Sequence, residues 1–365
     1  MNQRRLKNTL VVLAGVALAA LGVYNIVLKA TWTLMDDGVF WKVTSQGLVA
    51  ARISSGGPAA RAGVRLGDVL LAVDGEEVLR PSALESALAA RRPGDHVAYS
   101  LLREEERRIL NVQVRPLPKG NVSAFYYLSI LGLFSLVVGT VVMLRRPADR
   151  TSLHFYTICV LFFLLYSMSY TGKLSLLDWT IFWADHLAIL FLPAVFLHFC
   201  LSFPERRFRA RRMWLVPALY LPALVLAGAA VMSYALFAAG EEPGALWGMV
   251  EAIDRVMPLY FAVFFALAFA VLRNSCRRTR SLIARRQVKW LLWGTGTGVF
   301  PFLAFYALPF ALGREPGFTM QLLAYVPLAL IPLAVAYAVV VLPKGREYWT
   351  SASHCRYGVM FQSSS

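Results

Sequence analysis

Eight apolar runs, each about as long as a bilayer core is thick, constrain this chain more than any other feature. A hydrocarbon core of about 30 Å is crossed by about 20 apolar residues in a helix. Runs of this kind lie at Thr9–Leu28, Val122–Leu144, Leu153–Tyr170, Trp179–Leu201, Trp214–Phe237, Val256–Leu272, Val288–Leu312 and Met320–Leu342. The sequence therefore predicts a membrane protein whose spanning part is an all-α bundle of about eight helices.

The composition agrees with a membrane location. Of 365 residues, 58% are hydrophobic and 16% are charged, which is more apolar surface than one soluble core encloses. The net charge of +16 is of the sign that nucleic-acid-binding proteins carry. Here, however, the arginines occupy short segments between apolar runs. We therefore expect membrane lipid, and no nucleic acid, as a partner.

Basic segments alternate with acidic or neutral ones along the chain. Arginines precede the first run and fill the segments between the second and third, fourth and fifth, and sixth and seventh runs. The segment Ala238–Asp254 carries four acidic residues instead and is expected to be a loop. Because cytoplasmic loops are enriched in Lys and Arg, we predict a multi-pass protein of the cell membrane with both termini in the cytoplasm.

The first run is either an uncleaved anchor or a signal peptide. Ala17-Leu18-Ala19 offers small residues for cleavage, but the run of about 20 residues exceeds the usual signal core of about 7–15. We predict an anchor over residues 1–30. In both cases the segment that follows, residues 31–118, is extracytoplasmic.

Short apolar stretches and turn residues characterise that exported segment. The stretches are Leu48–Ile53, Val69–Val73, Val97–Leu102 and Ile109–Val114, with a helical pattern over Pro81–Ala90. Strands separated by turns, with one helix, predict a small α+β domain built on a partly open barrel or sandwich.

One motif in this segment resembles a known family. Gly56, Pro58-Ala59, Ala62-Gly63-Val64, Gly67-Asp68 and Asp74-Gly75 stand in the register of the PDZ family in its bacterial, protease-associated form. The resemblance implies a peptide-binding domain. In such domains an extended peptide adds as a strand to a sheet edge, and backbone amides of a tight loop capture its terminal carboxylate.

The same resemblance implies a set of peptide-binding residues. Gly38-Val39-Phe40-Trp41 matches the carboxylate loop of the family, and its alternative is a juxtamembrane linker. The opposite wall is expected on the helix Pro81–Ala90, where Ser82, Ser86 and Ala89 share one face. Leu84 and Leu88 on that helix line either the groove or the core. The expected ligand is a peptide or a protein C-terminus.

The motifs of common enzymes are missing from the sequence. It contains neither His-Glu-x-x-His nor Gly-x-Ser-x-Gly. The four cysteines are isolated. We expect no catalytic residues, no metal and no cofactor.

Ionisable residues inside apolar runs are costly and mark functional sites by default. Asp185 and His186 lie in the fourth run, and Arg255 lies at the outer end of the sixth. We consider these three residues an intramembrane ligand site. The alternative is an interfacial Asp185-His186 pair beside a water-filled cleft, with Arg255 in a solvated helix start.

Small residues and prolines predict the packing of the last two runs. Gly294 and Gly298 have the spacing at which helices approach closely. Pro301, Pro309, Pro327 and Pro332 are expected to kink their helices.

The helical part resembles the membrane sensor region of certain bacterial histidine kinases. The residues that carry the resemblance are Arg285–Gly294, Pro301-Phe302, Pro309 and Leu330–Val339. An anchor, an external PDZ domain and seven further spans over residues 119–343 are similar to the competence quorum-sensing kinase of Gram-positive bacteria. The resemblance implies a receptor that acts as a homodimer and signals to a cytoplasmic or membrane partner.

The kinase domain of that family is not recognisable in residues 344–365, which we expect to be a short cytoplasmic tail. A truncated or frameshifted kinase and a free-standing sensor remain as explanations. The alternative function is a non-catalytic scaffold or regulatory subunit that holds an extracytoplasmic protein near a membrane partner.

Overall fold

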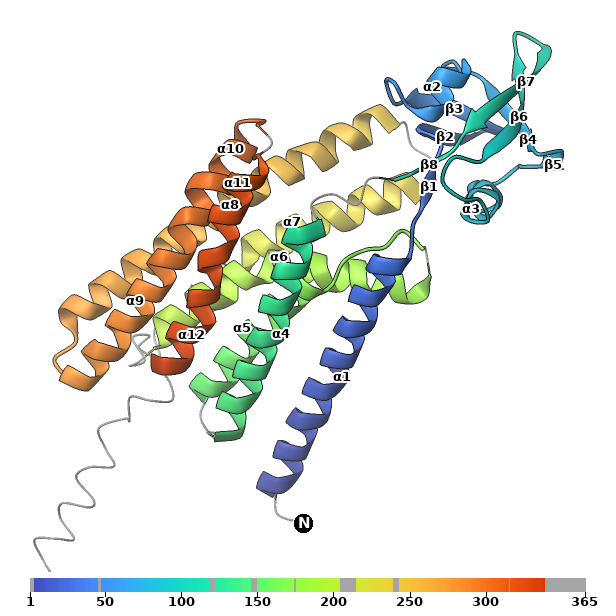
Figure 1. Ribbon diagram of the computed structural model, residues 1–365. Helices are drawn as coiled ribbons and strands as arrows, with labels where there is room; N and C mark the ends of the chain where they lie inside the picture. Colours follow the sequence, from blue (N-terminus) through green and yellow to red (C-terminus); the bar gives the residue numbers. More distant parts are fainter. Residues whose placement is uncertain are drawn as a thin grey trace, which may run out of the picture.

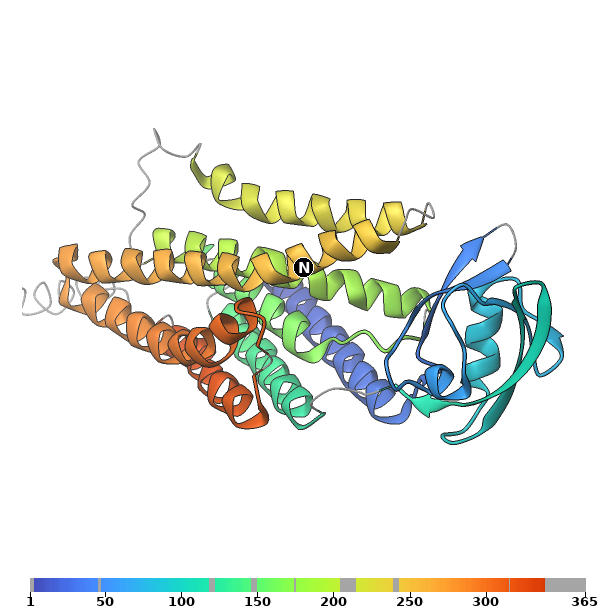
Figure 2. The same cartoon turned by 90° about the horizontal axis from the view of Figure 1, so that it is seen from above.

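The computed structural model describes residues 3–44, 47–117, 122–145, 150–173, 175–203, 215–238, 243–314 and 316–338. The expected tail, residues 344–365, lies outside these ranges. Long helices lie side by side, and a small sheet-containing module stands at one end of them (Figures 1 and 2). This arrangement agrees with the predicted membrane bundle and single α+β module.

Seven helices are long and apolar enough to cross a membrane, judged by length and composition over the described residues. Most are continuous: α1 (Gln3–Thr31), α4 (Val122–Arg145), α6 (Leu176–Ser202), α7 (Leu215–Ala238) and α8 (Pro243–Arg278). The last two are segmented and are described below. An eighth, shorter apolar helix, α5 (Arg150–Ser167), packs against α4 and α6.

The third predicted span has the expected length of 18 residues but lies three residues nearer the N-terminus. We predicted it to continue to Tyr170, but α5 ends at Ser167. The chain after the helix is held by side chains of other helices, since Ser169 N donates to Asn25 Oδ1 (2.9 Å) and Thr171 N to Asp178 Oδ1 (2.8 Å). At 1.5 Å per residue α5 is about 27 Å long, slightly less than a typical core.

The acidic segment before the sixth run is also not the loop that we predicted. Helix α8 already begins at Pro243 and includes Glu251 and Asp254. Its 36 residues exceed what a bilayer core requires. The pattern of apolar residues locates the part of a helix that suits lipid, but it does not reveal how far the helix continues into water.

The last two runs change helix type close to three of the four prolines that we predicted to kink them. Helix α9 (Leu282–Phe302) passes into the π-helix η2 (Leu303–Ala307) and then α10 (Leu308–Ala311). Helix α11 (Phe318–Tyr325) passes into the 3-10 helix η3 (Val326–Ala329) and then α12 (Leu330–Ala336). Each break lies beside a proline, which cannot donate the main-chain hydrogen bond that continues an α-helix.

The module contains one main sheet with the strand order β2-β3-β4-β6-β7. Its strands are β2 (Val39–Thr44), β3 (Gly47–Ile53), β4 (Val69–Val73), β6 (His96–Arg103) and β7 (Glu106–Gln113), and the short β5 (Glu76–Glu77) pairs with β4. All of these pairs are antiparallel. Two helices complete the module, α2 (Pro58–Ala62) and α3 (Pro81–Ala89).

A second, two-stranded pairing connects the module to the helices. Strand β1 (Met35–Asp36) pairs with β8 (Arg115–Pro116), and Leu117 N donates to Leu34 O (2.9 Å). The chain therefore enters and leaves the module at one point, between α1 and α4. Asn25, buried on α1, exchanges two hydrogen bonds with the main chain of Ser169, so that α1 is attached to the bundle.

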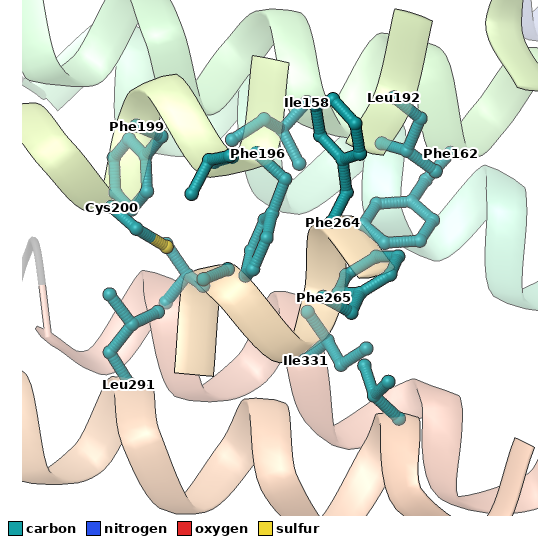
Figure 3. Close-up of a cluster of buried hydrophobic side chains, with 14 of the residues drawn as sticks. Ile158, Phe162, Leu192, Phe196, Phe199, Cys200, Phe264, Phe265, Leu291 and Ile331 are labelled. Carbon is teal, nitrogen blue, oxygen red and sulfur yellow. The ribbon is translucent and has the colours of Figure 1, made fainter. Parts of the chain in front are cut away.

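The bundle has an aromatic core. Figure 3 shows Phe162 of α5, Phe196 and Phe199 of α6, and Phe264 and Phe265 of α8 in one buried cluster. Tyr260 OH donates to Leu190 O (2.8 Å), which connects α8 to α6. In lipid the hydrophobic effect does not draw helices together. Close van der Waals contact of this kind is therefore what stabilises a bundle in a membrane.

Close packing of α9 on α12 confirms the role predicted for the two glycines. A Cβ atom on Gly294 would lie 2.0 Å from Ala334 Cβ, and one on Gly298 would lie 2.6 Å from Ile331 Cγ1. No side chain fits at either position without a shift of the helices.

We expect Gly294→Ala to lower the thermal midpoint of the full chain in detergent micelles, because overpacking costs about 1–3 kcal/mol. The matched control is Gly228→Ala on α7, where an added Cβ meets nothing within 4 Å. Since both changes gain the same helix propensity of about 1 kcal/mol, the control is expected to be neutral or stabilising. Equal effects would contradict the packing role.

Candidate functional site

The predicted carboxylate loop is built around a buried acid. Asp37 is 3% exposed and precedes Gly38. Its Oδ1 accepts from Val39 N (2.9 Å), and its Oδ2 accepts from Trp41 Nε1 (2.8 Å) and from Tyr99 OH (2.8 Å). Burial raises the pKa of Asp37, and the neighbouring Asp36 adds to this effect. The three hydrogen bonds lower the pKa and only partly offset the effect of burial.

Main-chain bonds hold the same loop against the start of α2. Asp37 O accepts from Ala59 N (2.9 Å), and Gly38 O accepts from Ser54 N (2.8 Å). Gly38 has a φ of +76°, and a Cβ atom there would lie 3.2 Å from Pro58 Cδ. The conformation of this turn therefore depends on glycine at position 38.

The structure corrects one boundary of this site. We predicted that Gly38-Val39-Phe40-Trp41 is a loop, but Val39, Phe40 and Trp41 already belong to β2. A register shift interrupts the β2–β3 pairing between Phe40 and Trp41. Such a bulge turns side chains out of the regular alternation, and Trp41 packs against the module core while its indole N–H reaches Asp37.

Helix α3 resolves an alternative that the sequence left open. Leu84 and Leu88 are buried in the module core. Ser86 and Ala89 are exposed, so the predicted shared face does point away from the core at these two positions. The side chain of Ser82 lies outside the described part of the structure. Because α3 contacts β1, it stands near the turn that leads into β2.

Asp68 of the family motif has a structural role. Its carboxylate receives two hydrogen bonds from Arg103, Nε to Oδ1 (2.7 Å) and Nη2 to Oδ2 (2.6 Å), and a third from Arg65 N (2.8 Å). Arg103 Nη2 also donates to Gly63 O (2.8 Å). Burial alone would raise the pKa of Asp68. The hydrogen bonds from Arg103 and from Arg65 N outweigh this effect and lower the pKa.

The comparisons with known proteins agree with this geometry. A family model described as the PDZ domain matches residues 22–114. This module is a PDZ domain. It is related to the PDZ domains of periplasmic proteases: a probable periplasmic serine endoprotease DegP-like of Halomonas elongata is 39% identical over 79 residues, and the serine endoprotease DegS of Escherichia coli is 33% identical over 78 residues.

These matches cover a small part of each protein. The H. elongata match spans 22% of this chain and 17% of the relative, and the DegS match spans 21% of both. A solved structure of the HtrA-type protease AlgW with decapeptide is 28% identical with a TM-score of 0.23, and covers 24% of this chain and 30% of that one. The PDZ match ends at residue 114. The resemblance of the helical part to sensor kinases therefore stays a prediction.

The residues predicted as an intramembrane site are partly brought together. Asp185 and His186, on α6, both line a cavity of about 450 Å³ within the bundle. Arg255 lies in α8, and its side chain is outside the described part. Within the described residues, no group of three or more His, Cys, Asp or Glu side chains could hold a metal ion.

Two features of the sites were missed by sequence reasoning. Asp37 and Tyr99 are 62 residues apart, and no spacing rule connects an acid beside a glycine to a tyrosine on a later strand. The aromatic lining of the cavity comes from several helices, so it too appears only in the folded bundle. An acidic residue directly before Gly38 was the available signal for Asp37.

We expect Asp68→Asn to destabilise the PDZ domain by about 2 kcal/mol, because it removes the charge-assisted hydrogen bonds between the half-buried Arg103 and the buried Asp68 carboxylate. The loss should appear as faster hydrogen exchange of β4 and β6 amides in the full chain. Since the folded-state pKa is lowered, this stabilisation is fully present above the unfolded value of about 3.9 and is lost as pH falls through the folded value.

The matched control is Glu106→Gln, which removes an ion pair with Arg108 whose side chains are 72% and 51% exposed. Exposed pairs contribute little, so exchange should be unchanged. An Asp68→Asn variant that exchanges like the control would contradict the structural role.

Proposed function

We propose that this protein binds an extended polypeptide segment at strand β2 of its PDZ domain, on the outer side of the cell membrane, and transmits binding to its helical bundle. The observation that carries the proposal is that β2 is the terminal strand of the sheet, beside a turn that depends on Gly38. A terminal strand is a template for one more strand, and PDZ domains use it in this way.

The way the PDZ domain is connected to the helices supports transmission of peptide binding to the helical bundle. Its two connections to the helices are the paired strands β1 and β8, and β1 leads directly into Asp37 and β2. A segment that adds to β2 would act on the same short stretch that continues into α1. For a signal to pass, the bound segment must favour one arrangement of the bundle over another.

Binding of a peptide through a free terminal carboxylate is disfavoured at this site. The amide of Val39, which the family resemblance assigns to carboxylate capture, already donates to Asp37 Oδ1. A terminal carboxylate would have to displace this bond and lie beside a second negative charge, which is unfavourable. We infer that main-chain pairing along β2, more than carboxylate capture, holds the bound segment.

The receptor and scaffold hypotheses use the same binding site. The receptor hypothesis rests on the resemblance to sensor kinases, from which the homodimer and the cytoplasmic or membrane partner are also carried over. The segmented helices α9 to α12 favour it, since breaks at η2 and η3 are places where packing can change. A scaffold would hold its extracytoplasmic protein without a change in these helices.

We expect Gly38→Ala to weaken binding of a randomised decapeptide library to the full chain in nanodiscs by about tenfold, the equivalent of one or two hydrogen bonds. The matched control is Gly56→Ala, which also has a positive φ (+71°) but whose added Cβ meets nothing within 4 Å. Fluorescence anisotropy measures both. Equal losses would indicate general strain, and no binding by the unmodified chain would end the proposal.

We expect the unmodified chain to bind a peptide with an amidated terminus at least as tightly as the same peptide with a free carboxyl terminus, as measured by fluorescence anisotropy. The reason is that a terminal carboxylate would lie beside the Asp37 carboxylate, whose Oδ1 already accepts from the Val39 amide. A strong preference of the unmodified chain for free-acid peptides would show instead that carboxylate capture prevails.

A further inference from the structure

A cavity of about 450 Å³ lies inside the helical bundle, on the side of α6 that carries Asp185 and His186. Side chains of α4 to α9 and of the segmented last helices line it. Phe162, Phe265 and Ile331 belong both to this lining and to the buried cluster in Figure 3. The cavity is thus continuous with the aromatic core, and its size is within the range of small-molecule sites, about 300–1,000 Å³.

One buried acceptor in the cavity lining lacks a hydrogen bond. Asp185 Oδ1 is inaccessible to solvent and has no hydrogen-bond partner among the described residues. Leaving such an acceptor unsatisfied is costly, more so for a charged group. Asp37 in the PDZ domain, by contrast, is buried and accepts three hydrogen bonds.

Two of the rings that line the cavity with Asp185, those of His186 and Tyr234, pack against further aromatic rings. Tyr234 of α7 lines the cavity, with its ring centroid 5.0 Å from that of Phe182 and 5.4 Å from that of Trp183. The His186 ring lies 4.0 Å from that of Phe182. Aromatic faces attract cations, most strongly where water is excluded.

We propose that the bundle cavity binds an amphiphile with a protonated amine head and a single apolar chain. The ammonium group binds the Asp185 carboxylate beside the ring of Tyr234, and the chain lies among the apolar residues of the cavity. This proposal concerns the bundle alone and does not depend on peptide binding by the PDZ domain.

Lys29 is the internal cation that bears on this site. It lies in the last turn of α1 and acts on Asp185 through space. Its ammonium donates to Ser169 Oγ and lies 4.8 Å from the centroid of the Phe125 ring. Lys29 therefore moderates the charge of Asp185 through space but does not donate a hydrogen bond to Oδ1.

The experiment compares n-decylamine with n-decanol, which differ in the head group and share the chain. Saturable binding of each labelled probe is measured to the full chain in phosphatidylcholine nanodiscs at pH 7, after subtraction of uptake by protein-free discs. An alkylamine is protonated at this pH, as a lysine side chain is. We expect decylamine to bind about tenfold more tightly or better, as a charge-assisted hydrogen bond contributes.

Substitutions at Asp185 and in the cavity wall test whether the probes bind at this site. Asp185→Asn should reduce decylamine binding to the level of decanol and leave decanol binding unchanged, which also shows that the cavity is intact. Ala230→Phe, on the buried side of α7, should remove saturable binding of both probes, whereas Val231→Phe on its exposed side should remove neither.

Equal affinity for the two probes in the unmodified chain would overturn the proposal, as would absence of saturable binding or an amine preference that survives Asp185→Asn. The first two results do not require any variant to fold.

Discussion

The pairing of β1 with β8 is the contact on which the arrangement of this protein depends. The edges of an open sheet leave main-chain groups without hydrogen-bond partners in lipid, so this sheet must lie outside a membrane-spanning bundle and its ends must be joined to adjacent helices. The two short strands and the bond from Leu117 N to Leu34 O bring these ends together. The PDZ domain can therefore be inserted between α1 and α4 while both helices remain packed in one bundle.

The carboxylates of Asp37 and Asp185 differ in how many hydrogen bonds they accept from the rest of the protein. Asp37 is surrounded by donors from the main chain, a tryptophan and a tyrosine, so its burial is offset by hydrogen bonds and it organises the start of β2. Asp185 lies in an apolar cavity with one oxygen that accepts no bond from the described residues. The first is a completed network. The second is incomplete among the described residues, and in our proposal a bound amine complements it.

Parts of the fold were predictable because local chemistry decided them. The strand Val69–Val73 was predicted with its observed limits, since the apolar run is bounded by Gly67-Asp68 and Asp74-Gly75. The helix from Pro81 was predicted within one residue of its end. The strand β2 was missed, because its alternation is interrupted by a bulge at Phe40 and Trp41. The end of α5 was missed because side chains of α1 and α6 hold the residues after it.

The sequence by itself determined that apolar helices gather in a bundle, that a PDZ domain interrupts them after the first, and that Gly294 and Gly298 lie at a close helix contact. These features follow from hydrophobic length, turn chemistry and residue size, which act over a few neighbouring positions. Only the tertiary structure decided that Asp37 meets Tyr99, that α1 is attached through Asn25, and that Asp185 faces a cavity. Each of these depends on side chains far apart in the chain, whose approach is set by packing of whole elements.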